Sequence, residues 1–264
     1  MDRWEPDDRI YLFGVGRGGY CAVSLARLLG TVGVLPNNSD GLLDYALATY
    51  AVPRTHRSAQ DWQRITGVAR QLAGGHDVAV LVRFLGLWDA VKPPGLPRTS
   101  AAEPLTNVQA GRHARAIDGS PPDTLGVRSD CVEEVWFRGS HGDVAGAATD
   151  GPAPADISLD WVLDGAAAAG AAVSDTRRGL APTPTEASAL AGMSRTLSLH
   201  RPPENASVHA SVDIYLRAHP QYWRRLPARV MWADRDWLAR GERLVCTSDR
   251  PTVAAAPQLL TAAS

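Results

Sequence analysis

The chain has 264 residues, of which 45% are hydrophobic, and its formal net charge is -1. This size and apolar content suit one large globular domain or two small ones. The near-neutral charge excludes the basic footprint of a nucleic-acid-binding protein. No run of about 18 apolar residues predicts a transmembrane helix, and the acidic N-terminus excludes a cleavable signal peptide. We therefore expect a cytoplasmic protein.

The three cysteines, Cys21, Cys131 and Cys246, are scattered through the sequence without the spacing of metal ligands. An odd number of cysteines fits a reducing compartment better than a disulfide framework. We expect neither a metal nor another cofactor.

A glycine-rich segment follows a short apolar stretch near the N-terminus. Residues 9–13 predict a buried strand, and the helical spacing of apolar residues predicts a helix over 20–29. Between them, Gly14, Gly16 and Gly19 match the dinucleotide-binding pattern Gly-x-Gly-x-x-Gly. Gly14 and Gly18 also flank the middle position of a nucleophile elbow, Gly-x-Ser-x-Gly, in which Gly16 replaces the serine. The rest of the chain must decide between these two interpretations.

Further elements follow in an order that favours an α/β fold with a mainly parallel sheet and flanking helices. A long apolar run over 78–88 and a second over 132–138 predict strands that are buried on both faces. Residues 176–198 are irregular, and the last segment, 251–264, predicts a frayed tail. Helices are predicted over 42–50, 62–72, 107–117, 208–216 and a segment that Asp156 caps.

Polar groups follow each of the predicted strands. The glycine segment follows the first strand, Asp89 follows the second, and His141 follows the third. Working groups in parallel sheets gather at the carboxyl ends of strands, and the order nucleophile, acid, histidine is that of α/β hydrolases. The acid holds the imidazole tautomer and the imidazole takes the proton of a hydroxyl, so two of the three groups are present.

Each of these residues also has a simpler interpretation. Asp89 could cap a helix or stabilise a turn, and His141 could be an exposed or structural residue of its glycine- and serine-containing loop. Asp143 could be the acid instead of Asp89, or it could brace the loop. The three strand-end positions in the right order are what favour the catalytic interpretation.

Four segments resemble a family of α/β hydrolases that includes the type VI secretion phospholipase effectors. Residues 4–20 are similar to its Tyr-Glu-Pro-Gly-Asp-Arg-Ile segment, strand and Gly-Phe-Ser-Arg-Gly-Ala-Tyr elbow. Residues 84–91 resemble Phe-Leu-Gly-Val-Trp-Asp-Thr-Val, and residues 112–118 resemble Arg-His-Ala-Leu-Ala-Leu-Asp. Residues 135–146 resemble Val-Trp-Phe-x-Gly-x-His-Ser-Asp-Val-Gly-Gly. The resemblance extends over most of residues 4–230.

The resemblance implies that Gly16 occupies the nucleophile position, that Asp89 is the triad acid and that His141 is the base. The serine of the family is therefore lost, and Ser24 and Ser140 are the nearest hydroxyls in the sequence. Ser24 lies too far into the predicted helix to replace it. The resemblance also implies a partial α/β-hydrolase fold from which the N-terminal strands of the family are missing.

We therefore expect a truncated hydrolase-like catalytic domain over 1–175, a C-terminal extension of the same domain over 176–250, and a flexible tail over 251–264. The expected function is that of a degenerate lipase- or esterase-type domain, inactive because Gly16 has no hydroxyl. The family implies a lipid or ester substrate. The alternative is a non-catalytic binding or accessory module that pairs with a separate polypeptide supplying the missing strands.

Dinucleotide binding through Gly14, Gly16 and Gly19 is the third interpretation. A dinucleotide-binding unit needs an acidic residue at the end of the next strand, about 20 residues further on. Asp40 and Asp44 lie near that distance, but the sequence before them does not predict a strand.

Overall fold

A computed structural model of the chain describes residues 5, 7–34, 58–72, 79–94, 104–118, 125–127, 129–146, 154–174 and 201–237. The predicted helix at 42–50, the irregular segment at 176–198 and the predicted tail at 251–264 lie outside these residues. The described strands are β1 (Ile10–Val15), β2 (Val82–Trp88), β3 (Gly111–Ala116), β4 (Val132–Phe137), β5 (Ala206–His209) and β6 (Val230–Ala233). The helices are α1 (Arg17–Thr31), α3 (Ala59–Leu72), α4 (His141–Ala145), α5 (Pro154–Ala168), α7 (Ala210–Ala218) and the 3₁₀ helix η3 (Pro220–Arg225).

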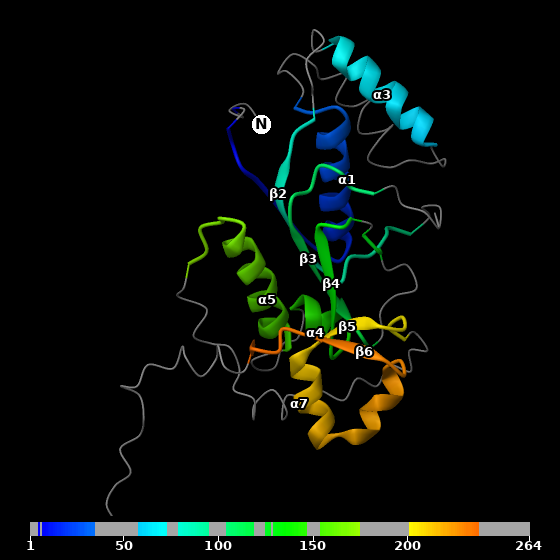
Figure 1. Ribbon diagram of the computed structural model, residues 1–264, viewed down its shortest axis with the longest axis vertical. Coiled ribbons are helices and arrows are strands. Elements are labelled where there is room, and N and C mark those ends of the chain that lie inside the picture. Colours follow the sequence, from blue (N-terminus) through cyan, green and yellow to red (C-terminus); the bar gives the residue numbers. More distant parts are fainter. Residues whose placement is uncertain are drawn as a thin grey trace, which may run out of the picture.

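The strands form one six-stranded sheet in which the spatial order is the same as the chain order, β1 to β6 (Figure 1). Every neighbouring pair is parallel. This confirms the predicted α/β class with a parallel sheet and flanking helices. It also puts β1 at one edge of the described sheet and β6 at the other.

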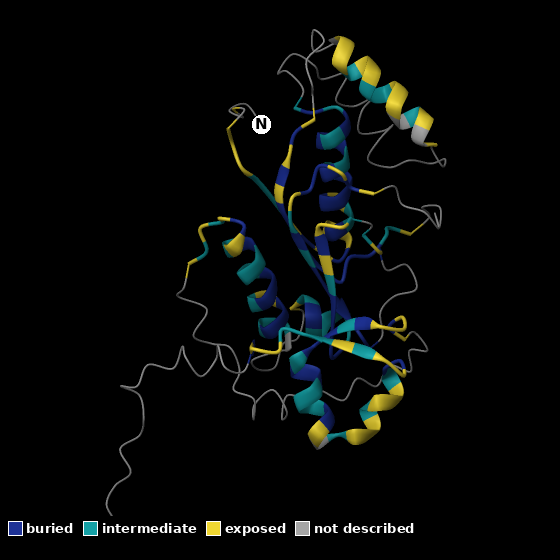
Figure 2. Ribbon diagram, viewed as in Figure 1, coloured by how far each residue is buried: buried dark blue, intermediate teal, exposed yellow. Residues whose placement is uncertain are grey.

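Helices cover the two faces of the sheet, because alternate residues of the central strands point to opposite sides. In β2, Phe84 and Trp88 pack into one hydrophobic cluster with Trp161 of α5. Leu85 and Leu87 pack into a second cluster with the buried residues of α1. Figure 2 shows the strands between these helices as largely buried, whereas α3 is largely exposed. In the described part of the chain, no helix combines the length and the apolar character needed to cross a membrane.

The helix predicted over 107–117 is wrong, because most of this segment is strand β3, which lies between β2 and β4. The alanine and arginine residues of this segment favour a helix in isolation. Pairing on both sides overrides that preference here. The strand needs small residues: a Cβ on Gly111 would lie 2.7 Å from the carbonyl oxygen of Leu85, and Ala114 and Ala116 are fully buried.

The C-terminal part of the sheet was only partly predicted. Residues predicted as one helix over 208–216 divide into the end of β5 and most of α7, and β6 was not predicted. These two strands have only four residues each, too few to show a clear alternating pattern. Asp156 lies in the first turn of α5 and is not its N-cap.

Candidate active site

The turn between β1 and α1 has the backbone geometry of a nucleophile elbow. At Gly16, φ is 52° and ψ is -116°, a combination that L-amino acids with a Cβ adopt only under strain. The carbonyl oxygen of Gly16 accepts hydrogen bonds from the N–H groups of Gly19 at 3.1 Å and Val91 at 3.0 Å. Its own N–H donates to the carbonyl oxygen of Trp88 at 2.9 Å. The sharp turn is therefore fixed from both sides by the backbone.

The glycines on either side of Gly16 let the chain pack closely around the turn. A Cβ on Gly14 would lie 2.4 Å from the carbonyl oxygen of Gly18, and a Cβ on Gly19 would lie 2.6 Å from the Cβ of Ala90. Real Cβ atoms do not approach other atoms so closely, so neither position tolerates a larger residue without a shift of the backbone. The elbow itself thus accounts for the glycines that the dinucleotide pattern counts.

Asp89 lies directly after β2, at the carboxyl end of the strand that pairs with β1. Asp89 is completely buried, and its Oδ1 accepts a hydrogen bond from the N–H of Ala116 at 3.2 Å. Its φ of 38° is in the left-handed region that residues other than glycine seldom adopt. Strain of this kind persists where the surrounding structure imposes it, often at functional sites.

His141 is the first residue of α4, a short helix that begins just beyond β4. Its Nδ1 lies 2.7 Å from Oδ2 of Asp89. The loop before it is held by Asp143, whose Oδ2 accepts from the N–H of Ser140 at 2.7 Å and from its hydroxyl at 2.8 Å. Asp89 and not Asp143 is therefore the partner of His141, and Asp143 braces the loop.

The other side of the imidazole faces Gly16. A Cβ built on Gly16 would lie 3.1 Å from both Nε2 and Cε1 of His141. A hydroxyl attached to that carbon would be within hydrogen-bonding reach of Nε2, which is the arrangement that lets an imidazole activate a serine. The structure therefore brings together the three residues that the sequence predicted for the site: Gly16, Asp89 and His141.

Asp89 sets the electrostatics of the pair. The hydrogen bond to Asp89 raises the pKa of His141 above its usual value of 6.5, helped by the negative charge of the carboxylate and opposed by partial burial. A histidine paired in this way is a stronger base than a free one. The pair has the properties of the acid and base of a hydrolytic triad.

The two serines nearest to Gly16 in sequence occupy other positions. Ser140 uses its hydroxyl to donate to Asp143. Ser24 is a buried residue of α1, about two turns beyond the elbow. The described residues also hold no group of three or more His, Cys, Asp or Glu side chains that could bind a metal ion.

One residue of this region was missed as a functional candidate. His113 is a fully buried residue of β3, and its Nε2 accepts a hydrogen bond from the N–H of Ala90, next to Asp89. The segment that contains His113 was predicted to be a helix, so the sequence gave no reason to place this histidine near Asp89. The signal in the sequence was its position within the segment 112–118 that resembles the hydrolase family.

Comparison with known proteins gives one family and one curated relative. The family described as "T6SS, Phospholipase effector Tle1-like, catalytic domain" matches residues 1–165. "Uncharacterized protein YEL023C" of Saccharomyces cerevisiae (strain ATCC 204508 / S288c) is 30% identical over 100 residues. That match spans 37% of this chain and 15% of the yeast protein. No solved structure matches the chain significantly.

The pairing of Asp89 with His141 predicts the pH dependence of this site. We expect the pKa of His141, measured by NMR titration of its ring, to lie above 6.5. Asp89→Asn should lower it. Because the pKa is higher in the folded than in the unfolded chain, the pair stabilises the fold at pH values below the unfolded pKa, and this contribution is lost as the pH rises through the folded pKa. An unchanged His141 pKa in Asp89→Asn would contradict the pairing.

Proposed function

The chain belongs to the catalytic-domain family of the Tle1-like phospholipase effectors of type VI secretion systems, and from this membership we propose that it is a hydrolase-type domain without hydrolase activity. The observation that carries the proposal is the geometry at Gly16. The elbow, the acid and the base have the arrangement of a serine hydrolase site, but the position that faces Nε2 of His141 holds a glycine. Without a hydroxyl, no acyl-enzyme can form.

We propose that the chain retains other parts of a serine hydrolase site. In α/β hydrolases the backbone N–H of the residue after the nucleophile is one oxyanion donor, and Arg17 has that place at the start of α1. The ligand of the site would be a lipid or another ester, the substrate class to which the family description points. Binding through the glycine fingerprint to a dinucleotide is disfavoured, since each of its glycines serves the elbow. The acidic candidates Asp40 and Asp44 lie outside the described residues, so the structure does not bear on them.

The first consequence is inactivity. We expect the purified protein to hydrolyse neither p-nitrophenyl esters nor phospholipids above a buffer control, as measured by release of nitrophenolate or fatty acid. Oxyanion stabilisation and substrate binding without a triad can leave a rate roughly 10³ to 10⁴ above that in water. Any residual hydrolysis rate of this kind should be the same in the His141→Ala variant. Turnover that His141→Ala abolishes would contradict the proposal.

The second consequence is that a single change should restore the nucleophile. Gly16→Ser puts a Cβ 3.1 Å from the His141 ring, a tight contact that a shift of a few tenths of an ångström relieves. We expect a fluorophosphonate probe to label the introduced hydroxyl, with the adduct located by mass spectrometry. Adding His141→Ala should slow labelling by about 10² to 10⁴, the usual contribution of a general base.

Gly16→Ala is the matched control for this experiment. It introduces the same Cβ and the same backbone strain at φ 52° but no hydroxyl, so it should remain unlabelled. A folded Gly16→Ser protein that also remains unlabelled would contradict the claim that the hydroxyl is the group the site lacks.

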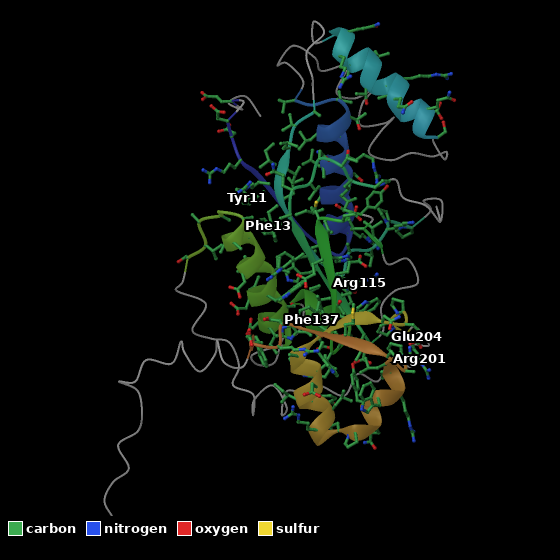
Figure 3. The ribbon with its side chains drawn as sticks, viewed as in Figure 1. Tyr11, Phe13, Arg115, Phe137, Arg201 and Glu204 are labelled. Carbon is green, nitrogen blue, oxygen red and sulfur yellow. The ribbon has the colours of Figure 1, made fainter. Side chains whose placement is uncertain are left out.

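A specific observation favours the alternative of an accessory module. Strand β1 lies at an edge of the described sheet and contains neither proline nor a charged residue, the devices that usually protect such edges. Phe13 is 45% exposed and Val15 is 46% exposed. Figure 3 shows Tyr11 and Phe13 on this strand. We propose that the occupant of this edge is a strand from a separate polypeptide.

The edge predicts the behaviour of the protein alone. In analytical ultracentrifugation we expect self-association or aggregation, because among the described residues β1 has a partner strand on one side only, which leaves its other side available for pairing. Phe13→Lys should shift the protein toward a monomer.

Two controls locate the effect. Met231→Lys tests β6, the opposite edge of the described sheet, where Met231 is 56% exposed. Val68→Lys tests an exposed apolar residue of α3, away from the sheet. Val68→Lys should not change the association state, whereas an effect of Met231→Lys would place the association at β6 instead of β1. A stable monomer that melts cooperatively without any substitution would contradict the accessory-module proposal.

A further inference from the structure

The candidate site has a second, buried histidine behind its acid. His113 lies in β3 with no exposed surface. Its Nε2 accepts a hydrogen bond from the N–H of Ala90 at 3.1 Å, and its Nδ1 lies 2.9 Å from Oε1 of Glu134 in β4. A ring nitrogen that accepts from a backbone N–H carries no proton, so the proton is on Nδ1 and is donated to Glu134. The imidazole thus links β4 to the residue that follows Asp89.

Glu134 is a firm anchor for this link. It also accepts hydrogen bonds from the N–H of Val127 at 3.2 Å and from Arg115 at 3.4 Å. Burial alone would raise the pKa of Glu134, but the hydrogen bond with His113, the charge of Arg115 and the hydrogen bond from the N–H of Val127 lower it below its usual value. The carboxylate is therefore ionised throughout the physiological pH range, and it holds the Nδ1–H tautomer of His113.

The other end of the link is the peptide group between Asp89 and Ala90. The orientation of this peptide fixes the ψ angle of Asp89, whose φ of 38° already places it in a strained conformation. The next residue, Val91, donates its N–H to the carbonyl oxygen of Gly16. In the peptide unit that joins Ala90 to Val91, the carbonyl oxygen of Ala90 accepts a hydrogen bond from the N–H of Leu125 at 2.7 Å. A shift of Ala90 would therefore move both the acid and the elbow.

We propose that His113 is a positioning residue of this site: its hydrogen bond to Ala90 holds the strained turn that directs the carboxylate of Asp89 at His141. The proposal rests on the proposed function, because it assumes that Asp89 and His141 act as an acid–base pair. Its role is distinct from that of a histidine that only fills the core. A core residue contributes stability alone, whereas a positioning residue also determines the proton affinity of His141, which it does not touch.

The test compares two polar substitutions at the same buried position. The amide of His113→Gln is long enough to approach the place of Nε2 and accept from Ala90. The amide of His113→Asn is shorter and reproduces only the Nδ1 side, toward Glu134. The readout is the pKa of His141, measured by NMR in the otherwise unmodified chain, with the His141 signal assigned by its loss in His141→Ala. The pKa of His141 can be measured in a protein without catalytic activity.

We expect His113→Asn to lose the upward shift of the His141 pKa and to approach Asp89→Asn, whereas His113→Gln should keep most of it. Asn107→Ala is the matched control for lost stability. Asn107 is buried and donates hydrogen bonds to the carbonyl oxygens of Ala26 and Val80. Neither of these bonds involves the turn that contains Asp89. This control should be destabilised and should keep the His141 pKa of the unmodified protein.

Three results would overturn the proposal, and they are distinguishable. If His113→Asn keeps the His141 pKa of the unmodified protein, His113 is not a positioning residue, while the acid–base pair stands. If the His141 pKa has its ordinary value in the unmodified protein, the pair itself fails and the proposal fails with it. A loss of the shift in Asn107→Ala equal to that in His113→Asn would also overturn it, because the effect would then follow stability alone.

Discussion

The backbone conformation at Gly16 is the constraint on which the site depends. With φ at 52° and ψ at -116°, the chain turns sharply from β1 into α1 and presents this one residue toward His141. The turn is possible because Gly14 and Gly19 allow backbone contacts that a Cβ would block. It is maintained by hydrogen bonds to Trp88 and Val91, on either side of Asp89. The elbow and the acid turn are therefore one interlocked unit at the ends of two paired strands.

This coupling is compatible with a glycine at the elbow position. An L-residue at such a φ costs about 1 to 3 kcal/mol of strain, which a serine hydrolase accepts because its chemistry needs the hydroxyl there. Glycine removes that cost. The acid and the base do not depend on the hydroxyl for their positions: Asp89 is held by Ala116, and His141 is held by Asp89 and by the start of α4. Glycine at this position therefore leaves Asp89 and His141 assembled.

The sequence predicted the parts of this structure that depend on local pattern. Glycine spacing located the elbow, and long apolar runs located β2 and β4, so that Asp89 and His141 followed from the rule for parallel sheets. The sequence did not predict β3, because the identity of that segment depends on its two neighbours and not on its own alanine-rich composition. His113 was missed as a site residue for the same reason. The division of the chain into 1–175, 176–250 and a tail stays a prediction, although β5 and β6 join the same sheet as β1.

The most direct test of the account is a nuclear Overhauser effect between Gly16 and His141. One α-hydrogen of Gly16 points along the direction of a Cβ, whose position would lie 3.1 Å from Cε1 of the imidazole. We expect a strong cross-peak between that hydrogen and the Hε1 of His141. The contact of Gly19 with the methyl group of Ala90 supplies an internal reference, because a Cβ there would lie 2.6 Å from that carbon. A Gly19–Ala90 cross-peak without the Gly16–His141 cross-peak would show a folded elbow that does not face the histidine, and would contradict the account.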